Sequence, residues 1–258
     1  FKVSFYDYTI SRLVFVGVSN YVQAFGSAPF WRSVCATFEY AVIILPVTVL
    51  VSLWISKVLS TRGKKINAFA KAVFYLPSVT NQVALVIVWN FLFSPAFGLV
   101  ASIFRILKLD PISWFDSPVT AIPLLALLIC TYGLGQPVIL YTAAINGIPD
   151  CYFEAARIDG ATENQIFFSI TLRLLHGTTT YILITSTIGM LQIFAVPYLM
   201  TNGGPSFRTS TLLMLVYTSA FQNGSFGYAS AIGVVLFFIT AAIAFIQFRM
   251  MRQDAIEY

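Results

Sequence analysis

The sequence predicts an all-α integral membrane protein, built as a polytopic helical bundle. Of its 258 residues, 58% are hydrophobic and only 10% are charged, whereas soluble domains carry about 25% charged residues. A chain with so little charge cannot cover a globular surface with polar groups, so its surface must face hydrocarbon. Two further observations agree: the apolar residues form long stretches, and Lys and Arg gather in alternate connecting segments.

Five apolar stretches approach the roughly 20 residues that a membrane helix needs. The first is short, but Phe30, Trp31 and Phe38 on its flank extend it. Apart from Lys71 at one edge, none of the five contains an acidic residue, a Lys or an Arg. Prolines fall inside or near several of them, and membrane helices tolerate such kinks when neighbours satisfy the freed carbonyls. No repeated pair of interrupted spans is visible. The five visible spans are 40–55, 69–93, 119–145, 180–200 and 228–248.

The distribution of Lys and Arg predicts the orientation of these spans. The segment 57–71 carries five basic residues and no acid, so we expect it in the cytoplasm. Alternation then places 94–118 and 201–227 outside, and it places 146–177 and the C-terminus inside. Five spans with a cytoplasmic end leave Phe1 outside, which fits a missing sixth span before it. The net charge of +5 is then mostly a topology signal, and no nucleic-acid partner is expected.

Two regions follow from this topology. Residues 1–36 are expected to form an external N-terminal segment that leads into the first visible span. Residues 37–258 are expected to form the transmembrane domain, including the cytoplasmic loop at 146–177. The protein is accordingly expected in the plasma membrane as a multi-pass protein surrounded by lipid, with its C-terminus in the cytoplasm.

The cytoplasmic loop holds four of the ten carboxylates of the chain, on Asp150, Glu154, Asp159 and Glu163. Pro149 suits the first turn of a helix, and the acids after it lie near the positive end of that helix dipole. Glu154 and Arg157 are spaced to pair.

A glycine turn and a second helix are expected to follow. Gly160 can end the first helix in a left-handed conformation, and Thr162 with Gln165 forms a capping box for the second helix. A plain surface hairpin remains an alternative. The small side chains of Ala155, Ala156 and Ala161 favour docking into a groove instead.

This loop resembles the EAA loop of permease subunits of binding-protein-dependent ABC importers, and the rest of the chain resembles the maltose and glycerol-phosphate (carbohydrate uptake) type of that family. The resemblance implies that the loop forms a coupling helix, which sits in a cleft of a separate ATPase subunit. Where the family usually has proline, this chain has Arg173, so the exit from the loop continues further or breaks differently. The matching segments are Glu154-Ala155-Ala156 and Asp159-Gly160-Ala161 in the loop, Gly17 to Tyr21 near the start, Thr201-Asn202-Gly203-Gly204-Pro205, and Gly227 to Ala231.

The resemblance also implies the partners and the cofactors. They are a second homologous permease subunit, two ATPase subunits and an external solute-binding protein, which would meet the loop at Gly203, Gly204 and Pro205. The chain contains no G-x-x-x-x-G-K-[ST] motif, so nothing in it can cradle nucleotide phosphates. No cofactor is therefore expected on this chain, and ATP and Mg would be bound by the partner ATPase.

Polar side chains inside spans are expected to face protein or water. The segment that contains Tyr132 and Gln136 resembles the one that helps line the sugar site in maltose-type permeases, and Gln192 falls at the matching place in the next span. These three residues are the predicted substrate path, and helix–helix hydrogen bonding is the alternative. The absence of charge among them favours a neutral solute. Glu39 is expected at the outer edge of the first span, as an interfacial anchor.

Other classes of function fit less well. The three cysteines are widely spaced and predict neither disulfides nor a metal site. No catalytic residue is predicted: the one histidine, His176, is expected at the C-terminal end of a helix as a partner of its dipole. The chain is therefore interpreted as a transport subunit and not an enzyme. The alternatives are a secondary transporter or channel working without ATP, and a membrane scaffold.

Overall fold

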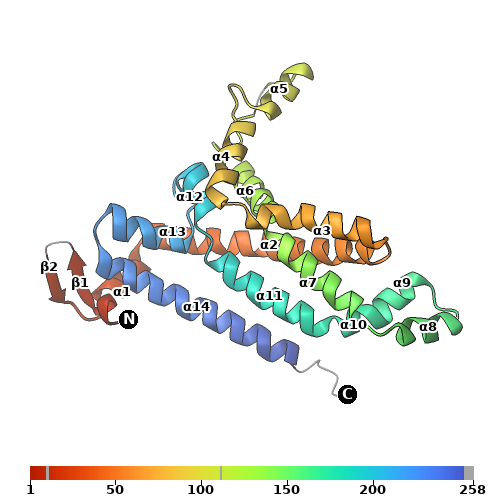
Figure 1. The fold of residues 1–258 in the computed structure, drawn as a ribbon. Coiled ribbons are helices and arrows are strands. Elements are labelled where there is room, and N and C mark those ends of the chain that lie inside the picture. The colour runs from red at the N-terminus through yellow and green to blue at the C-terminus, as the bar shows by residue number, and fades with distance from the viewer. Residues whose placement is uncertain (10–11, 111, 253–258) are drawn as a thin grey trace. The chain divides into compact units, whose positions relative to one another are not determined.

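The computed structural model describes residues 1–9, 12–110 and 112–252, and most of its regular structure is helical (Figure 1). The elements are η1 (Lys2–Phe5), β1 (Tyr6–Thr9), β2 (Arg12–Phe15), α1 (Ser19–Gly26), α2 (Ala28–Ser60), α3 (Lys64–Val79), α4 (Gln82–Leu92), α5 (Leu99–Ile106), α6 (Pro118–Gly133), α7 (Gly135–Asn146), α8 (Asp150–Ile158), α9 (Glu163–Ile166), η2 (Phe167–Thr171), α10 (Leu172–Leu174), α11 (His176–Leu191), α12 (Ala195–Thr201), α13 (Leu212–Tyr217), η3 (Thr218–Gln222) and α14 (Phe226–Arg252).

The helical membrane fold predicted from the sequence is confirmed. Three helical segments are long and apolar enough to cross a membrane: Ala28–Ser60, His176–Thr201 and Phe226–Met251. Two broken pairs, Lys65–Val79 with Gln82–Leu92 and Val119–Gly133 with Gly135–Asn146, bring the number to five if each pair is one span. The five predicted spans correspond to these five, although the first is much longer than the predicted 40–55.

Two of the predicted spans are interrupted, although no repeated pair of interrupted spans was visible in the sequence. The predicted span 69–93 is broken between α3 and α4, because Pro77 falls in the last turns of α3 and the side chain of Asn81 accepts a hydrogen bond from Val83 N (2.8 Å) to cap α4. The predicted span 119–145 is broken at Leu134, and Pro137 in the first turn of α7 cannot donate to the carbonyl of Gly133.

The chain divides into two compact units, which are described separately. The first unit contains Phe1–Ile44, Asn81–Ile129 and Thr187–Ile243. The second contains Leu45–Thr80, Cys130–Ser186 and the chain from Ala244 onward.

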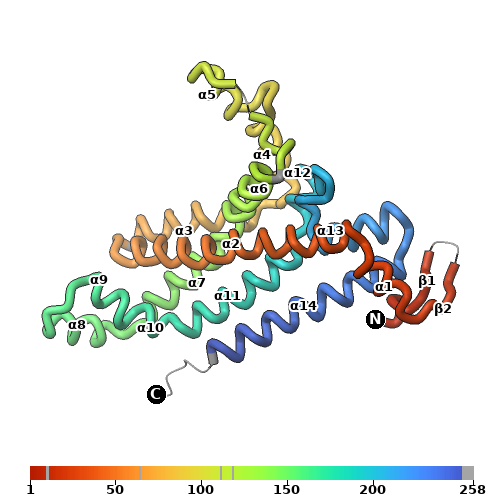
Figure 2. Tube along the Cα trace, turned by 180° about the vertical axis from the view of Figure 1, so that it is seen from behind, coloured from red at the N-terminus to blue at the C-terminus, as the bar shows by residue number. Residues whose placement is uncertain are grey.

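The first unit packs the N-terminal end of α2 against α13 and α14. Its core is apolar, with Phe30 from α2, Leu212 from α13 and Ile232 from α14 almost completely buried. The antiparallel hairpin of β1 and β2 pairs Tyr6 with Phe15 and lies beside α1 (Figures 1 and 2). Because α2 already begins at Ala28, the boundary drawn after residue 36 lies inside this helix.

Glycine and asparagine hold the N-terminal hairpin in place. Asn20 Nδ2 donates to the carbonyls of Ser4 and Tyr6, each at 2.9 Å. The carbonyl of Tyr6 approaches Gly227 so closely that any side chain there would overlap it. The close approach explains why glycine stands at this position of α14.

The second unit packs α7 against α3, the C-terminal half of α2 and α11. Tyr141 and Ile145 of α7 are buried together with Leu175 and Ile182. Val138, one turn earlier on α7, packs against Ile55 and Leu59 of α2. A buried hydroxyl in this core is paired: Ser56 Oγ donates to the carbonyl of Val138 at 3.0 Å. This unit carries the hairpin formed by α8, α9, η2 and α10 (Figure 1).

Candidate functional site

The acidic segment forms the predicted hairpin, which is called here the acidic hairpin (residues 150–174). α8 begins directly after Pro149, which is the N-cap rather than a first-turn residue. Gly160 ends the helix with a φ of +78°, a left-handed conformation that confirms its predicted role. The amide of Ala161 then donates to the carbonyl of Ala156 at 2.9 Å, which ties the turn back onto α8.

The capping box at the start of the second helix is also confirmed. Thr162 Oγ1 accepts from Gln165 N, and Gln165 Oε1 accepts from Thr162 N at 2.8 Å. The pairing predicted between Glu154 and Arg157 is wrong, because Arg157 instead forms an ion pair with Glu163 at 3.1 Å. This pair joins the two arms of the hairpin across the glycine turn, which the spacing rule for one helix could not anticipate.

One face of α8 is exposed and largely apolar. Tyr152, Ala155 and Ile158 lie on it, and Ile158 is 86% exposed. The carboxylates of Glu154 and Asp159 are exposed beside them, whereas Ala156 is buried against the rest of the hairpin. Small, apolar and acidic groups on one free helix face are suited to insertion into a groove on another protein.

A lysine ties the hairpin to α2. Lys57 Nζ donates to Asn164 Oδ1 at 3.0 Å and lies 4.3 Å from the centre of the Phe167 ring. A cavity of 620 Å³ lies beside this tie, lined by α2, the end of α7 and both arms of the hairpin. The sequence analysis used Lys57 only as a topology signal and missed this contact, because a pair separated by 107 residues leaves no pattern in the sequence.

The exit from the hairpin continues almost directly into the next span. α9 passes into the π-helical turn η2 and then α10, and only Leu175 separates α10 from α11. His176 therefore begins a helix instead of ending one, which corrects its expected position. Its Nε2 lies 2.7 Å from the carbonyl of Met251 in the last turn of α14, so it does meet a helix C-terminus, but that of another helix.

The loop at 201–210 is the predicted contact with a binding protein, and it lies in the first unit. Gly203 adopts a φ of +79°, and Gly204 is followed by a cis peptide bond to Pro205. The Thr209 hydroxyl donates to the carbonyl of Gly204 at 2.7 Å. Arg32 on α2 donates to the carbonyl of Ser206 at 2.9 Å. The loop therefore has a defined shape, fixed by its own hydroxyls and by α2.

The predicted path residues all lie at helix breaks. Tyr132, half-buried near the end of α6, and exposed Gln136, near the start of α7, lie on either side of Leu134 in the second unit. Exposed Gln192 follows α11 directly, in the interruption before α12, and belongs to the first unit. The structure thus brings two of the three residues to one break.

Apolar spans, two of them broken, joined to an exposed and capped hairpin are the architecture of a helical membrane transport subunit. Residues 49–253 match the family described as "Binding-protein-dependent transport system inner membrane component", and the chain belongs to this family. The similarity to curated relatives extends over nearly the whole chain. The probable ABC transporter permease protein YurN of Bacillus subtilis is 31% identical over 92% of this chain and 82% of its own length.

A second relative is the trehalose/maltose transport system permease protein MalF of Thermococcus litoralis, which is 28% identical over 92% of this chain and 80% of its own length. Among solved structures, a bacterial ABC transporter involved in the import of the acidic polysaccharide alginate superimposes with a TM-score of 0.84 over 93% of this chain and 85% of that chain. The sequence identity is 22%, so this likeness establishes the fold.

Proposed function

We propose that this chain is the permease subunit of an ATP-driven importer that passes a sugar or a similar small polar solute from an external binding protein across the membrane. The relatives named for trehalose/maltose and lactose transport support a sugar as the solute. The absence of charge among Tyr132, Gln136 and Gln192 agrees with a neutral solute. In this proposal residues 37–258 form the transmembrane domain, with the C-terminus in the cytoplasm.

The observation that carries the proposal is the exposed face of α8 on a rigid hairpin. Tyr152, Ala155 and Ile158 present a small apolar surface, and Glu154 with Asp159 adds acceptors at its edge. A helix that docks in a cleft of a partner ATPase would move with that subunit as a rigid body. The motion would reach α7 and α11, which flank the hairpin in the chain.

The remaining assembly follows from the same proposal. ATP and Mg are bound and hydrolysed on two partner ATPase subunits, a second homologous permease completes the membrane part, and the binding protein meets Gly203, Gly204 and Pro205. Ala156, Gly160 and Ala161 shape the coupling hairpin from within. The alternative without ATP, a secondary transporter or channel, would take up solute in vesicles that contain no nucleotide.

A bulky or charge-reversing change on α8 tests the coupling. In the complete complex, Ala155→Trp and Glu154→Lys are expected to reduce both copurification of the ATPase and uptake at least tenfold, with normal insertion of the permease. Arg62→Trp is the matched control, since Arg62 is exposed in the turn after α2 and outside the hairpin. Unchanged ATPase recovery and uptake in both α8 variants would contradict the proposal.

A separate variant tests the path. Gln192→Leu is expected to lower the uptake rate while ATPase copurification stays at the level of the unaltered complex. If Gln192→Leu instead abolishes assembly, Gln192 packs between helices and does not contact solute.

A further inference from the structure

Glu39 lies inside the helix α2, eleven residues after Ala28, and not at the start of the helix. The predicted first span began at residue 40, but the helix extends back to Ala28. Arg32 and Lys57, the basic residues towards its two ends, are 25 positions apart, or about 37 Å along the helix axis. A hydrocarbon core of about 30 Å centred between them begins only some 4 Å beyond Arg32. Glu39, about 10 Å from Arg32 along the axis, therefore lies inside that core.

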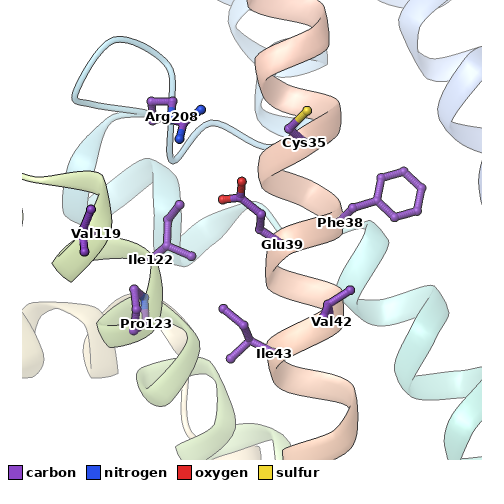
Figure 3. Close-up of a pocket in the computed structure, with 9 residues that line it drawn as sticks. All are labelled: Cys35, Phe38, Glu39, Val42, Ile43, Val119, Ile122, Pro123 and Arg208. Carbon is purple, nitrogen blue, oxygen red and sulfur yellow. The ribbon is translucent and has the colours of Figure 1, made fainter.

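The carboxylate of Glu39 faces a groove of 610 Å³ in the first unit (Figure 3). One wall is a single face of α2, which includes Cys35 and Val42, and the other is the start of α6 with Ile122. Arg208, from the loop that follows α12, closes one end of the groove. Figure 3 shows the Glu39 carboxylate turned towards the space between α2 and α6, and Phe38, the residue before it, also lines the groove.

The carboxylate has no ion-pair partner among the residues that the structure describes. Only two ion pairs occur among them, Arg12 with Asp7 and Arg157 with Glu163, so Arg208 lies more than 4.0 Å from Glu39. An ionisable side chain within the membrane is costly against lipid, and it almost always faces a water-filled cavity or the bundle interior. The groove is therefore expected to face water or the interior of a helical bundle and not lipid.

We propose that Glu39 and Arg208 form a solute-binding subsite at the outer end of the translocation path, and that it takes an uncharged, hydroxyl-rich solute. The inference rests on the proposed function for the nature of the solute. A carboxylate accepts from neighbouring hydroxyls and a guanidinium donates to them. Because the two side chains carry opposite charges, their effects on a simple ion oppose each other, and the pair gives no net preference for an anion or for a cation. A groove of this volume lies within the range of small-molecule sites.

The position of Arg208 connects this subsite to the loop at 201–210. Arg208 follows Pro205 by three residues, and its backbone amide donates to the carbonyl of Pro205 at 3.0 Å. A solute released at Gly203 and Gly204 would therefore lie close to Arg208, which lines the groove together with Glu39. The predicted path residues Tyr132, Gln136 and Gln192 are uncharged and lie elsewhere along the chain. This subsite therefore adds two charged side chains to the proposed path.

A native cysteine permits a test that does not depend on the identity of the solute. Cys35 is exposed and lines the groove, so a water-soluble thiol reagent reports whether water reaches it. The complete complex, with Cys130→Ser and Cys151→Ser, is placed in lipid nanodiscs and treated with the cationic reagent MTSET or the anionic reagent MTSES. The ratio of the two reaction rates measures the local electrostatic potential at Cys35.

Both reagents are expected to modify Cys35. Glu39→Gln is expected to lower the MTSET to MTSES rate ratio by about threefold to tenfold, and Arg208→Gln to raise it by a similar factor, since each removes one charge near the thiol. Phe38→Leu is the matched control: it changes a side chain that lines the groove without changing any charge, so the ratio is expected to stay the same. Arg208→Gln lies on an exposed loop, so it remains informative if Glu39→Gln fails to assemble.

Two results would overturn the inference. If Cys35 reacts with neither reagent, it lies against lipid or against the second permease. If the MTSET to MTSES rate ratio is unchanged in both charge variants, Glu39 and Arg208 do not contact the water that reaches Cys35. In parallel, uptake of radiolabelled trehalose is measured, and Glu39→Gln is expected to raise its KM at least fivefold. If the unaltered complex takes up no trehalose although Cys35 responds as expected, the proposed solute is wrong while the charged groove stands.

Discussion

Replacing Gly135 with alanine tests the close packing of α7 on α3. A Cβ atom at this position would lie 2.6 Å from the carbonyl oxygen of Phe74 and 3.0 Å from Cα of Tyr75. Both neighbours are backbone atoms and cannot rotate away, so the two helices must separate by several tenths of an ångström. Overpacking of this kind costs about 1–3 kcal/mol.

Gly133 provides the matched control for this change. It lies two residues earlier, at the end of α6, and a Cβ atom there would meet nothing within 4 Å. Both substitutions replace glycine with alanine at a helix end and have a similar effect on helix propensity. The difference between their free energies of unfolding therefore measures the cost of the close contact between α7 and α3. We expect Gly135→Ala to be about 1–3 kcal/mol less stable than Gly133→Ala.

The assay is unfolding of the purified permease by SDS in mixed micelles, followed by far-ultraviolet circular dichroism. The midpoint for Gly135→Ala is expected at lower SDS, and that for Gly133→Ala close to the unaltered protein. Equal midpoints for the two variants would show that α3 and α7 do not approach as closely as the structure has them, and the argument from Gly135 would fail.

Three further predictions concern the acidic hairpin. Gly160→Ala places a side chain at a φ of +78°, which costs about 1 kcal/mol, so amide hydrogen exchange around the turn should be about fivefold faster. Gly147→Ala is the control, because Gly147 has an ordinary negative φ, and it should leave the exchange rate unchanged. Thr162→Ala removes the cap of α9 and should destabilise that turn by about 1 kcal/mol, seen as faster exchange there but not in α8. Lys57→Met should reduce uptake more than ATP hydrolysis, because it cuts the tie to Asn164, and Asn164→Leu added to it should cause little further loss. Additive losses would mean that the two side chains act separately.

The acidic hairpin could be predicted almost completely from the sequence because its signals are local. Gly160 ends one helix in a left-handed conformation, and Thr162 with Gln165 caps the next helix. Each of these signals depends only on residues within one or two helical turns. The resemblance of Glu154-Ala155-Ala156 to a known motif added the functional reading. The partner of Arg157 was wrong, since it lies beyond the turn, and Pro149 is the N-cap and not a residue of the first turn.

The breaks in the spans were harder to predict. A hydropathy pattern reports that a stretch is apolar, and averaged over a window it gives no sign of the interruptions at Thr80 and at Leu134. Prolines stand close to both breaks, but Pro46 lies inside the unbroken helix α2. Whether a proline ends a helix depends on which neighbouring groups satisfy the freed carbonyl, and that is decided by tertiary packing.

The position of Glu39 shows a second limit. Placing a span by its most apolar window put this residue at the boundary, whereas the helix includes a polar first part with Arg32. The first part of α2 depends on the segment at 201–212, which takes up its polar groups, as in the bond from Leu212 N to Thr37 Oγ1 at 3.0 Å. Contacts between segments 175 residues apart are outside the reach of any window.

The π-helical turn η2 has a consequence for the phase of the chain after it. A π turn accommodates one residue more than the same length of α-helix, and one residue corresponds to about 100° of rotation. Deleting Ser169 would let Phe167–Thr171 wind as ordinary α-helix, and the adjoining half of α11 would then present a side about one quarter-turn away from its present one. The extra residue in η2 therefore sets which side chains of α11 face its neighbours. A relative that lacks one residue at this point would turn a different side of this helix towards those neighbours.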